Sequence, residues 1–159
     1  MSEPARPIEI RRVRAADVAD VVALVTEVLA EFDLEFGKGA TTDDELRALP
    51  ASYDDRGGAF WVATDGARLL GTAGVFPVAP GAYELRKMYL RPATRGLGLG
   101  GRLLDVAVAF ARERGATDLV LDTVEQMTRA IAFYEAHGFV RDDRQRRGAR
   151  CTRGYRRPL

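Results

Sequence analysis

The sequence predicts a single α/β domain in which helices cover the faces of a mixed β-sheet. Segments with alternating apolar and polar residues, typical of strands, are interspersed with segments whose apolar residues fall at helical spacing. A chain of 159 residues suits one hydrophobic core. No repeat, low-complexity tract or linker interrupts residues 1–159, so we expect one domain over this length.

The first part of the chain predicts a strand, a helix and an irregular segment. Apolar and basic residues alternate from Ile8 to Arg14, which predicts a half-buried strand. A helix follows, with Asp17 as its N-cap. Its apolar face consists of Val18, Val21, Val22, Val25 and Leu29. The acidic segment Leu34 to Gly58, rich in Gly, Asp and Thr, predicts a loop with a short helix around Asp43 to Leu49.

Three strands are expected in the middle of the chain. "AFWVAT" and "RLLGTAGVFPV" flank an Asp-Gly turn, which predicts a β-hairpin. "YELRKMYL", Tyr83 to Leu90, is the next predicted strand, and Pro92 helps to end it. Strict alternation along this strand places Glu84, Arg86 and Met88 on one face.

The remaining elements complete the order β-α-(α)-β-β-β-α-β-α-β-β. A helix is predicted from Leu99 to about Arg114, capped by Gly115. Its apolar face consists of Leu99, Leu103, Val106 and Phe110. "DLVLDTV" predicts a strand, and "MTRAIAFYEAHG" a second helix capped by Gly138. "FV" and "CTRGYRRPL" predict closing strands.

The stretch "LRPATRGLGLGGRLL" decides the function. Gly96, Gly98 and Gly101 match G-x-G-x-x-G, a pattern of dinucleotide-binding turns, and Asp122 lies about where such a site needs an acidic residue. In those folds, however, the first glycine follows its strand at once and comes early in the domain. Here "RPATR" intervenes and the motif begins past the middle of the chain. NAD is therefore not the favoured ligand.

A tight turn alone does not explain four glycines in six residues, because each glycine loses more backbone entropy on folding than alanine does. Close approach of a ligand to the backbone explains them better. N–H groups at a helix N-terminus bind phosphate, and Arg95 and Arg102 add positive charge beside them. The sequence thus predicts an anion site for a ligand other than NAD.

"RGLGLG" resembles the Arg/Gln-x-x-Gly-x-Gly/Ala signature of the GNAT superfamily of N-acetyltransferases, through Arg95, Gly98 and Gly100. The resemblance covers roughly Glu84 to Phe139, because "ELRKMYLRPATRGLGLGGRLL", "LVLDTV" and "MTRAIAFYEAHGF" follow in the order that this superfamily uses. It implies a GNAT-like acyl-CoA N-acyltransferase fold and acetyl-CoA as co-substrate. The implied acetyl-CoA contacts are Met88, Tyr89, Leu90, Arg95, Gly96, Leu97, Gly98, Leu99, Gly100, Gly101, Arg102 and Thr123.

One position departs from the superfamily pattern. Many members have Asn where this chain has Met127, and that Asn helps to hold the pantetheine arm. A methionine cannot make the same hydrogen bond, so its role is packing, and the contact either moves to Thr123 or is absent.

Acetyl transfer to an amine needs a base, a donor for the oxyanion and an acid for the leaving thiolate. An amine with a pKa near 10.4 is neutral in about one molecule in 10³ at pH 7, which costs roughly 4 kcal/mol. A carboxylate with a raised pKa reduces this cost. By the resemblance, Glu84 occupies the position where some GNAT enzymes place this base. The alternative is a strand-edge glutamate paired with Arg86 or Lys87.

The oxyanion donor and the acid are also implied by the resemblance. The backbone N–H of Leu90 is the expected donor, since a strand broken near Pro92 can leave an N–H unpaired. Tyr134 lies where the superfamily's general acid usually lies. Its alternative role is that of a core residue beside Phe133.

Arg86 is the candidate substrate-binding residue. About two residues, or roughly 7 Å, separate it from Glu84 on the same face, so it could hold the carboxylate of an amino-acid-like acceptor. Alternatively, Arg86 neutralises Glu84 or binds an acidic residue of the Leu34 to Asp55 segment.

Three further features have plain structural explanations. His137 precedes the capping Gly138, where a cationic side chain suits a helix C-terminus. Cys151 has no histidine close in sequence and is expected in a strand near the acceptor pocket. The arginine-rich tail, Arg141 to Arg157, contains a single aromatic residue, Tyr155, so a solvated turn is favoured over a nucleic-acid site.

Composition excludes several other classes. The net charge of +1 favours no charged partner. A single cysteine excludes an internal disulfide and a cysteine-based metal cage, and a single histidine argues against a multi-histidine metal site. No apolar run approaches the roughly 20 residues of a membrane span, and the N-terminus has no signal-like apolar region, so a cytoplasmic protein is expected.

We therefore expect an acetyltransferase that uses acetyl-CoA and a small amine acceptor by direct attack, without a metal, nucleic acid or membrane. The sequence does not decide whether the protein forms a homodimer. The alternatives are a non-catalytic acyl-CoA-binding or regulatory module on the same fold, acetylation of a protein amine, and nucleic-acid binding through the arginine tail.

Overall fold

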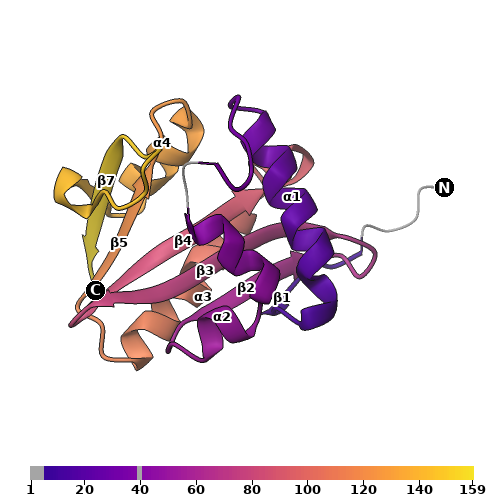
Figure 1. Ribbon diagram of the computed structural model, residues 1–159, viewed down its shortest axis with the longest axis horizontal. Coiled ribbons are helices and arrows are strands. Elements are labelled where there is room, and N and C mark those ends of the chain that lie inside the picture. Colours follow the sequence, from indigo (N-terminus) through magenta and orange to yellow (C-terminus); the bar gives the residue numbers. More distant parts are fainter. Residues whose placement is uncertain (1–5, 39–40) are drawn as a thin grey trace.

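Seven strands form one mixed sheet in the order β1-β2-β3-β4-β5-β7-β6 in the computed structural model, which describes residues 6–38 and 41–159 (Figure 1). The strands are β1 Glu9–Arg12, β2 Ala59–Thr64, β3 Leu69–Ala79, β4 Ala82–Leu90, β5 Asp118–Thr123, β6 Val140–Arg141 and β7 Arg153–Pro158. The α-helices are α1 Val18–Ala30, α2 Ala51–Asp54, α3 Leu99–Glu113 and α4 Thr128–Ala136. The predicted order of strands and helices and the α/β fold class are confirmed.

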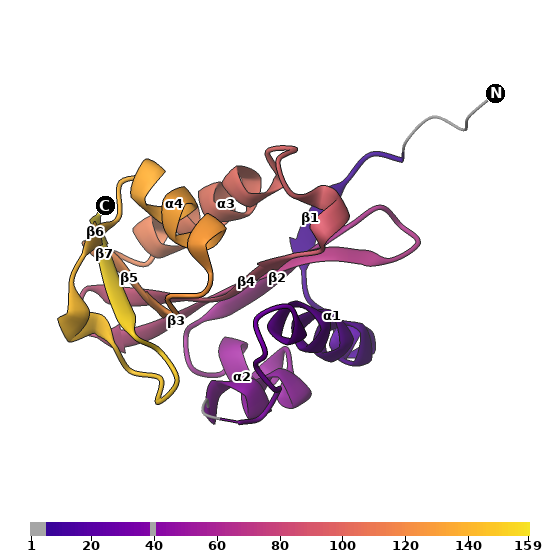
Figure 2. The same cartoon turned by 90° about the horizontal axis from the view of Figure 1, so that it is seen from above.

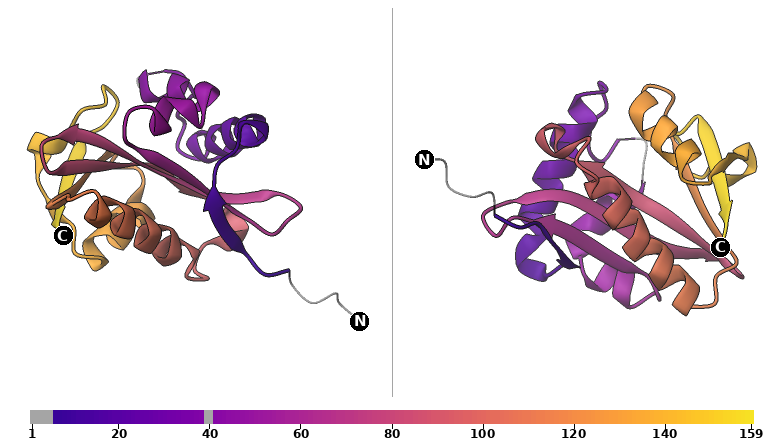
Figure 3. Two further views of the ribbon diagram at one scale, coloured as in Figure 1. Left: turned by 90° about the horizontal axis from the view of Figure 1, so that it is seen from below. Right: turned by 180° about the vertical axis from the view of Figure 1, so that it is seen from behind.

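Helices cover both faces of the sheet. Helices α3 and α4 lie on one face and α1 and α2 on the other (Figure 2), and α3 runs across the back of the sheet (Figure 3). Strand β2 is buried along its whole length. Ala59 and Trp61 pack in the core that includes α3, whereas Phe60 and Val62 pack in the core beneath α1. Because successive side chains of a strand point to opposite faces of the sheet, this one apolar strand contributes to both cores.

Helix α1 forms where the apolar spacing predicts it. Its buried residues are Val21, Leu24, Val25, Val28 and Leu29. Asp17 is the N-cap residue of α1, as predicted, but its side chain makes no capping hydrogen bond to this helix. The carboxylate instead accepts hydrogen bonds from the Arg14 N–H at 2.8 Å and from the Arg11 guanidinium at 2.7 and 2.9 Å.

From Thr41 to Asp54 the acidic segment contains more helix than the one short helix predicted around Asp43 to Leu49. A 3-10 helix covers Thr41–Ala48, and the unpredicted α2 follows at Ala51–Asp54. The β2–β3 hairpin is confirmed, with antiparallel pairing from Ala59 opposite Val75 to Thr64 opposite Leu69.

A β-bulge interrupts β4 and corrects one prediction. Lys87 has a left-handed φ of 54°, and the β3–β4 register shifts between Thr72 and Gly74. The Thr72 hydroxyl donates to the Lys87 carbonyl at 2.7 Å. Beyond the bulge, Met88 packs in the same core as Leu85, so it does not share a face with Glu84 and Arg86.

Strands β4 and β5 are the parallel pair that α3 connects. They pair only from Ala82 opposite Asp118 to Glu84 opposite Val120. Gly115 and Gly138, with φ of 79° and 87°, follow α3 and α4 as the predicted caps. The short β6 and the longer β7 close the sheet beside β5.

Candidate functional site

A cleft of about 1120 Å³ lies beyond the point where β4 and β5 stop pairing. It is bounded by β4, the glycine turn, the end of β5, α4 and the loop before β7. The predicted site residues that line it are Glu84, Arg86, Met88, Tyr89, Leu90, Arg95, Gly96, Gly98, Gly100, Gly101, Thr123 and Tyr134. Leu97, Leu99 and Arg102 do not line it: Leu97 is 71% exposed and Leu99 is buried in the core.

The glycine turn presents its backbone to this cleft. Gly96 and Gly98 have φ of 77° and 81°, and a Cβ on either would meet nothing within 4 Å. Hydrogen bonding in α3 begins with the Arg102 N–H donating to the Gly98 carbonyl, so the N–H groups of 98–101 precede the helical ladder. An open backbone at a helix N-terminus fits the pyrophosphate of a CoA thioester. A Cβ at Gly100 would lie 3.3 Å from Phe133, so packing against α4 also restricts that position.

Both arginines beside this turn donate hydrogen bonds to other parts of the chain. The Arg95 guanidinium donates to both carboxylate oxygens of Glu31 at 2.8 Å and to the Leu90 carbonyl at 3.0 Å. Arg102 donates to the Ile8 carbonyl at 3.0 Å. Their side chains therefore brace the turn against α1 and the N-terminal segment.

The pairing of β4 with β3 fixes the direction of the Leu90 backbone. Leu90 lies opposite Gly71, and the adjacent hydrogen bond runs from the Arg91 N–H to the Leu70 carbonyl at 2.9 Å. In an antiparallel ladder this makes the Leu90–Gly71 pair a non-hydrogen-bonded one. The Leu90 N–H therefore points away from β3, toward the side from which β5 has diverged.

Glu84 is a buried carboxylate at the base of the cleft, with 4% of its surface exposed. Its Oε1 accepts a hydrogen bond from Arg86 Nε at 2.5 Å. Its Oε2 is buried and has no hydrogen-bond partner among residues 6–38 and 41–159. Burial raises the pKa of Glu84, and Asp122 adds to this effect, while Arg86 and Arg147 partly offset it.

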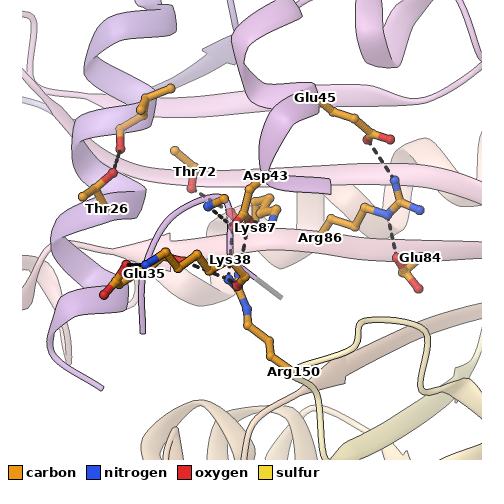
Figure 4. Close-up of polar contacts among 12 residues, drawn as sticks. Thr26, Glu35, Lys38, Asp43, Glu45, Thr72, Glu84, Arg86, Lys87 and Arg150 are labelled. Carbon is orange, nitrogen blue, oxygen red and sulfur yellow. Dashed lines mark hydrogen bonds and ion pairs between the residues drawn. The ribbon is translucent and has the colours of Figure 1, made fainter. Parts of the chain in front are cut away.

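Arg86 makes both contacts that the sequence left open as alternatives to binding substrate. Besides Glu84, it donates to Glu45 Oε2 of the acidic segment at 3.2 Å (Figure 4). Its guanidinium also lies 4.2 Å from the centre of the Phe76 ring. The guanidinium is thus oriented from two sides by neighbouring carboxylates.

Tyr134 lies in the wall of the cleft on α4 and is 8% exposed. Burial raises the pKa of its hydroxyl above the ordinary value, and the nearby Tyr89 adds to the rise. The hydroxyl therefore stays protonated at neutral pH. The Thr123 hydroxyl lies 3.8 Å from the Met127 sulfur, to which it donates, and Met127 packs in the core as expected.

Sequence reasoning missed a buried charge cluster at one end of the cleft. Asp43 is fully buried and accepts hydrogen bonds from Lys87 Nζ, from Arg150 at 3.0 and 3.2 Å, and from the Gly37 N–H at 2.8 Å (Figure 4). Burial opposes ionisation, but Lys87, Gly37 and Arg150 outweigh it and lower the pKa of Asp43. The cluster joins the acidic segment, the bulge of β4 and the loop before β7. No motif marks it, because these residues are far apart in sequence.

Comparison with known proteins agrees with this geometry. The model of the Acetyltransferase (GNAT) family matches residues 25–139. The chain belongs to this family. An uncharacterized N-acetyltransferase of Escherichia coli K12, YjgM, is 35% identical over 140 residues, which cover 86% of this chain and 83% of YjgM.

Two solved structures share the GNAT fold of this chain. A GNAT-family acetyltransferase of Staphylococcus aureus Mu50 has a TM-score of 0.89 at 22% identity, covering 96% of this chain and 99% of its own. The PaiA N-acetyltransferase of Thermoplasma acidophilum, in complex with coenzyme A, has a TM-score of 0.77 at 18% identity, with coverage of 96% and 99%. The chain is an acyl-CoA N-acyltransferase by family and fold.

The unique histidine and cysteine of this GNAT domain lie at the cleft. His137 is the C-cap of α4, and its Nδ1 lies 2.7 Å from the Phe133 carbonyl, which confirms its predicted position. Cys151 lines the cleft but precedes β7 rather than lying in a strand. Burial, with the Asp122 carboxylate, raises the pKa of the Cys151 thiol to about 12, so it remains protonated.

The arginine tail of this GNAT domain is largely ion-paired. Six of its eight arginines lie within 4.0 Å of carboxylates of described residues: Arg141, Arg144, Arg147, Arg150, Arg153 and Arg156. Within the described ranges, no helix has the length and apolar character of a membrane span, and no group of three or more metal-ligating side chains comes together.

Proposed function

We propose that this GNAT domain transfers the acetyl group of acetyl-CoA to the amine of a small molecule, with Glu84 as base and Tyr134 as acid. The observation that carries the proposal is that one cleft contains the glycine turn at the start of α3, a buried phenol, and a buried carboxylate oxygen that has no hydrogen-bond partner among the described residues. The coenzyme A complex of the Thermoplasma fold neighbour supports a CoA thioester as the acyl donor.

Bound acetyl-CoA would supply an activated acyl group. The N–H groups of 98–101 would hold its pyrophosphate, and Arg95 and Arg102 would keep the turn in place. The Leu90 N–H would donate to the carbonyl oxygen as negative charge develops on it. Glu84 Oε2 would accept a proton from the amine, directly or through water, and Tyr134 would donate one to the departing thiolate.

Arg86 orients the base in this proposal. Its bond to Glu84 Oε1 leaves Oε2 directed to the acceptor, and Glu45 and Phe76 fix the guanidinium from the other side. Binding of an acceptor carboxylate by Arg86 would require these two contacts to be given up, so the orienting role is favoured.

The proposal is tested by acceptor-dependent release of CoA from acetyl-CoA, measured over a panel of amino acids, polyamines and lysine peptides. Release that requires a small amine supports the proposal. Acetyl-CoA binding without release in the presence of any amine would indicate a non-catalytic binding module instead. Turnover of peptides alone would assign the acceptor to proteins.

A further inference from the structure

One buried carboxylate oxygen of the cleft has no hydrogen-bond partner in the part of the chain that the structure describes. Glu84 Oε2 is this oxygen, and Arg147 Nη1 lies 3.5 Å from it in an ion pair without a hydrogen bond. An unsatisfied buried oxygen is unfavourable, more so for a charged group. An N–H group of the acceptor amine would satisfy it.

Arg147 is fixed beside this oxygen by its backbone. Asp122, at the end of β5, accepts hydrogen bonds through Oδ2 from the N–H groups of Arg147 at 2.6 Å and Gly148 at 2.7 Å. The side chain lines the cleft and is 36% exposed. Only Nη1 of its guanidinium is hydrogen-bonded within the described ranges, to the backbone and side-chain oxygens of Gln145 at 3.2 and 3.3 Å. The remaining donors of the planar fork are available to a ligand.

Strand β4 and the loop before β7 contribute three other basic side chains to the cleft, and all three already bind carboxylates of the protein. Arg86 binds Glu84 and Glu45, and its side chain is 13% exposed. Lys87 and Arg150 both bind the buried Asp43, and they are 5% and 12% exposed at their side chains. Of these four basic side chains, Arg147 is the most exposed, and within the described residues it has guanidinium donors left for an incoming anion.

We propose that Arg147 binds the carboxylate of the acceptor while the acceptor amine lies at Glu84 Oε2, so that the acceptor is an α-amino acid or a similarly short amino-carboxylate. Glu84 Oε2 and Arg147 Nη1 are 3.5 Å apart, a short span. In an α-amino acid one carbon separates the amine nitrogen from the carboxyl carbon, a distance of about 2.5 Å. Each methylene inserted between them would draw the amine away from Glu84. The inference rests on the proposed function and names the substrate class of the same site.

The experiment compares kcat/KM for an α-amino acid, its carboxamide and a longer ω-amino acid, with acetyl-CoA. The variants are Arg147→Gln, Arg147→Lys and, as the matched control, Arg146→Gln, because Arg146 is an exposed neighbour that does not line the cleft. We expect wild type to prefer the amino acid over its amide by about 10–100-fold, the range of hydrogen bonds to charged groups. Arg147→Gln should bring this ratio close to one, mainly through KM, and Arg147→Lys should keep part of it. Arg146→Gln should keep all of it.

The readout is the ratio of kcat/KM for the amino acid to kcat/KM for its amide. Loss of Arg147 also changes the charge beside Glu84, but this change affects the amino acid and the amide alike. Equal turnover of amino acid and amide by wild type, or an unchanged ratio in Arg147→Gln, would overturn the inference and leave acetyl transfer intact. If no amine is turned over, the proposed function fails, and calorimetry of the same compounds in the presence of CoA decides this inference. Tighter binding of the amino acid that Arg147→Gln abolishes supports it, and equal binding refutes it.

Discussion

Replacing Asp43 by asparagine should destabilise this protein more than any comparable loss of charge in the same segment. The substitution keeps the size of the side chain but removes the negative charge between Lys87 and Arg150. Lys87 is 8% exposed and would remain a buried cation without a counter-ion. Removing one partner of a buried ion pair costs about 3–5 kcal/mol. For a chain of this length, that corresponds to a fall in Tm of roughly 6–20 °C.

The matched control is Asp44→Asn, which removes the same charge from the adjacent, exposed residue. Its free energy of unfolding should stay within about 0.5 kcal/mol of wild type. Urea unfolding, compared at equal m-values, measures both variants. Equal midpoints for Asp43→Asn and Asp44→Asn would refute the conclusion that the cluster is a buried, energetically coupled unit.

The pH dependence has a definite sign. Since the folded-state pKa of Asp43 lies below its ordinary value of 3.8, its contribution to stability is fully present above that value. It is lost as the pH falls through the lower folded-state pKa. The difference in stability between wild type and Asp43→Asn should therefore shrink on acidification below about pH 4, and a difference that stays constant or grows would contradict this assignment.

Three further outcomes are expected. Glu84→Gln should reduce kcat/KM most at neutral pH and recover in part at high pH, where the amine loses its proton unaided; a wild-type pH profile would assign Glu84 to structure. Tyr134→Phe should lower kcat by about 10²–10⁴ with CoA affinity nearly unchanged, and unchanged kcat would remove Tyr134 as the acid. Gly98→Val should weaken CoA binding because it strains a backbone at φ 81° and fills open space in front of it, and Gly100→Val should do so by displacing Phe133. Calorimetry with CoA on folded protein checks both glycine variants. Unchanged CoA affinity in both would refute the proposal that the backbone of 98–101 holds the pyrophosphate.

The elements that the sequence predicted well depend on local patterns. Apolar spacing located α1 and α3, the Asp-Gly turn located the β2–β3 hairpin, and the glycines located the open backbone at the start of α3. Glu84 and Tyr134 could be placed in one cleft because the order of the elements resembles a known family.

The features that escaped prediction depend on contacts between distant residues. Alternation along β4 fails at Lys87, because one residue with positive φ moves every later side chain to the other face. Asp43 lies 44 residues from Lys87 and 107 from Arg150, so its acidic segment resembles a solvated loop until the fold buries it. Asp17 lies at the N-cap of α1 without a capping hydrogen bond, because its carboxylate binds the Arg11 guanidinium instead, a contact that no local pattern shows.

The central claim, that this cleft performs direct acetyl transfer from acetyl-CoA to an amine, is tested most directly by mass spectrometry with isotopically labelled acetyl-CoA. We expect the label to appear on the amine nitrogen of a small acceptor in an amount equal to the CoA released. We also expect the mass of the protein to stay unchanged during turnover. Labelled protein at Cys151, or tightly bound acetyl-CoA with no labelled amine for any acceptor, would contradict it.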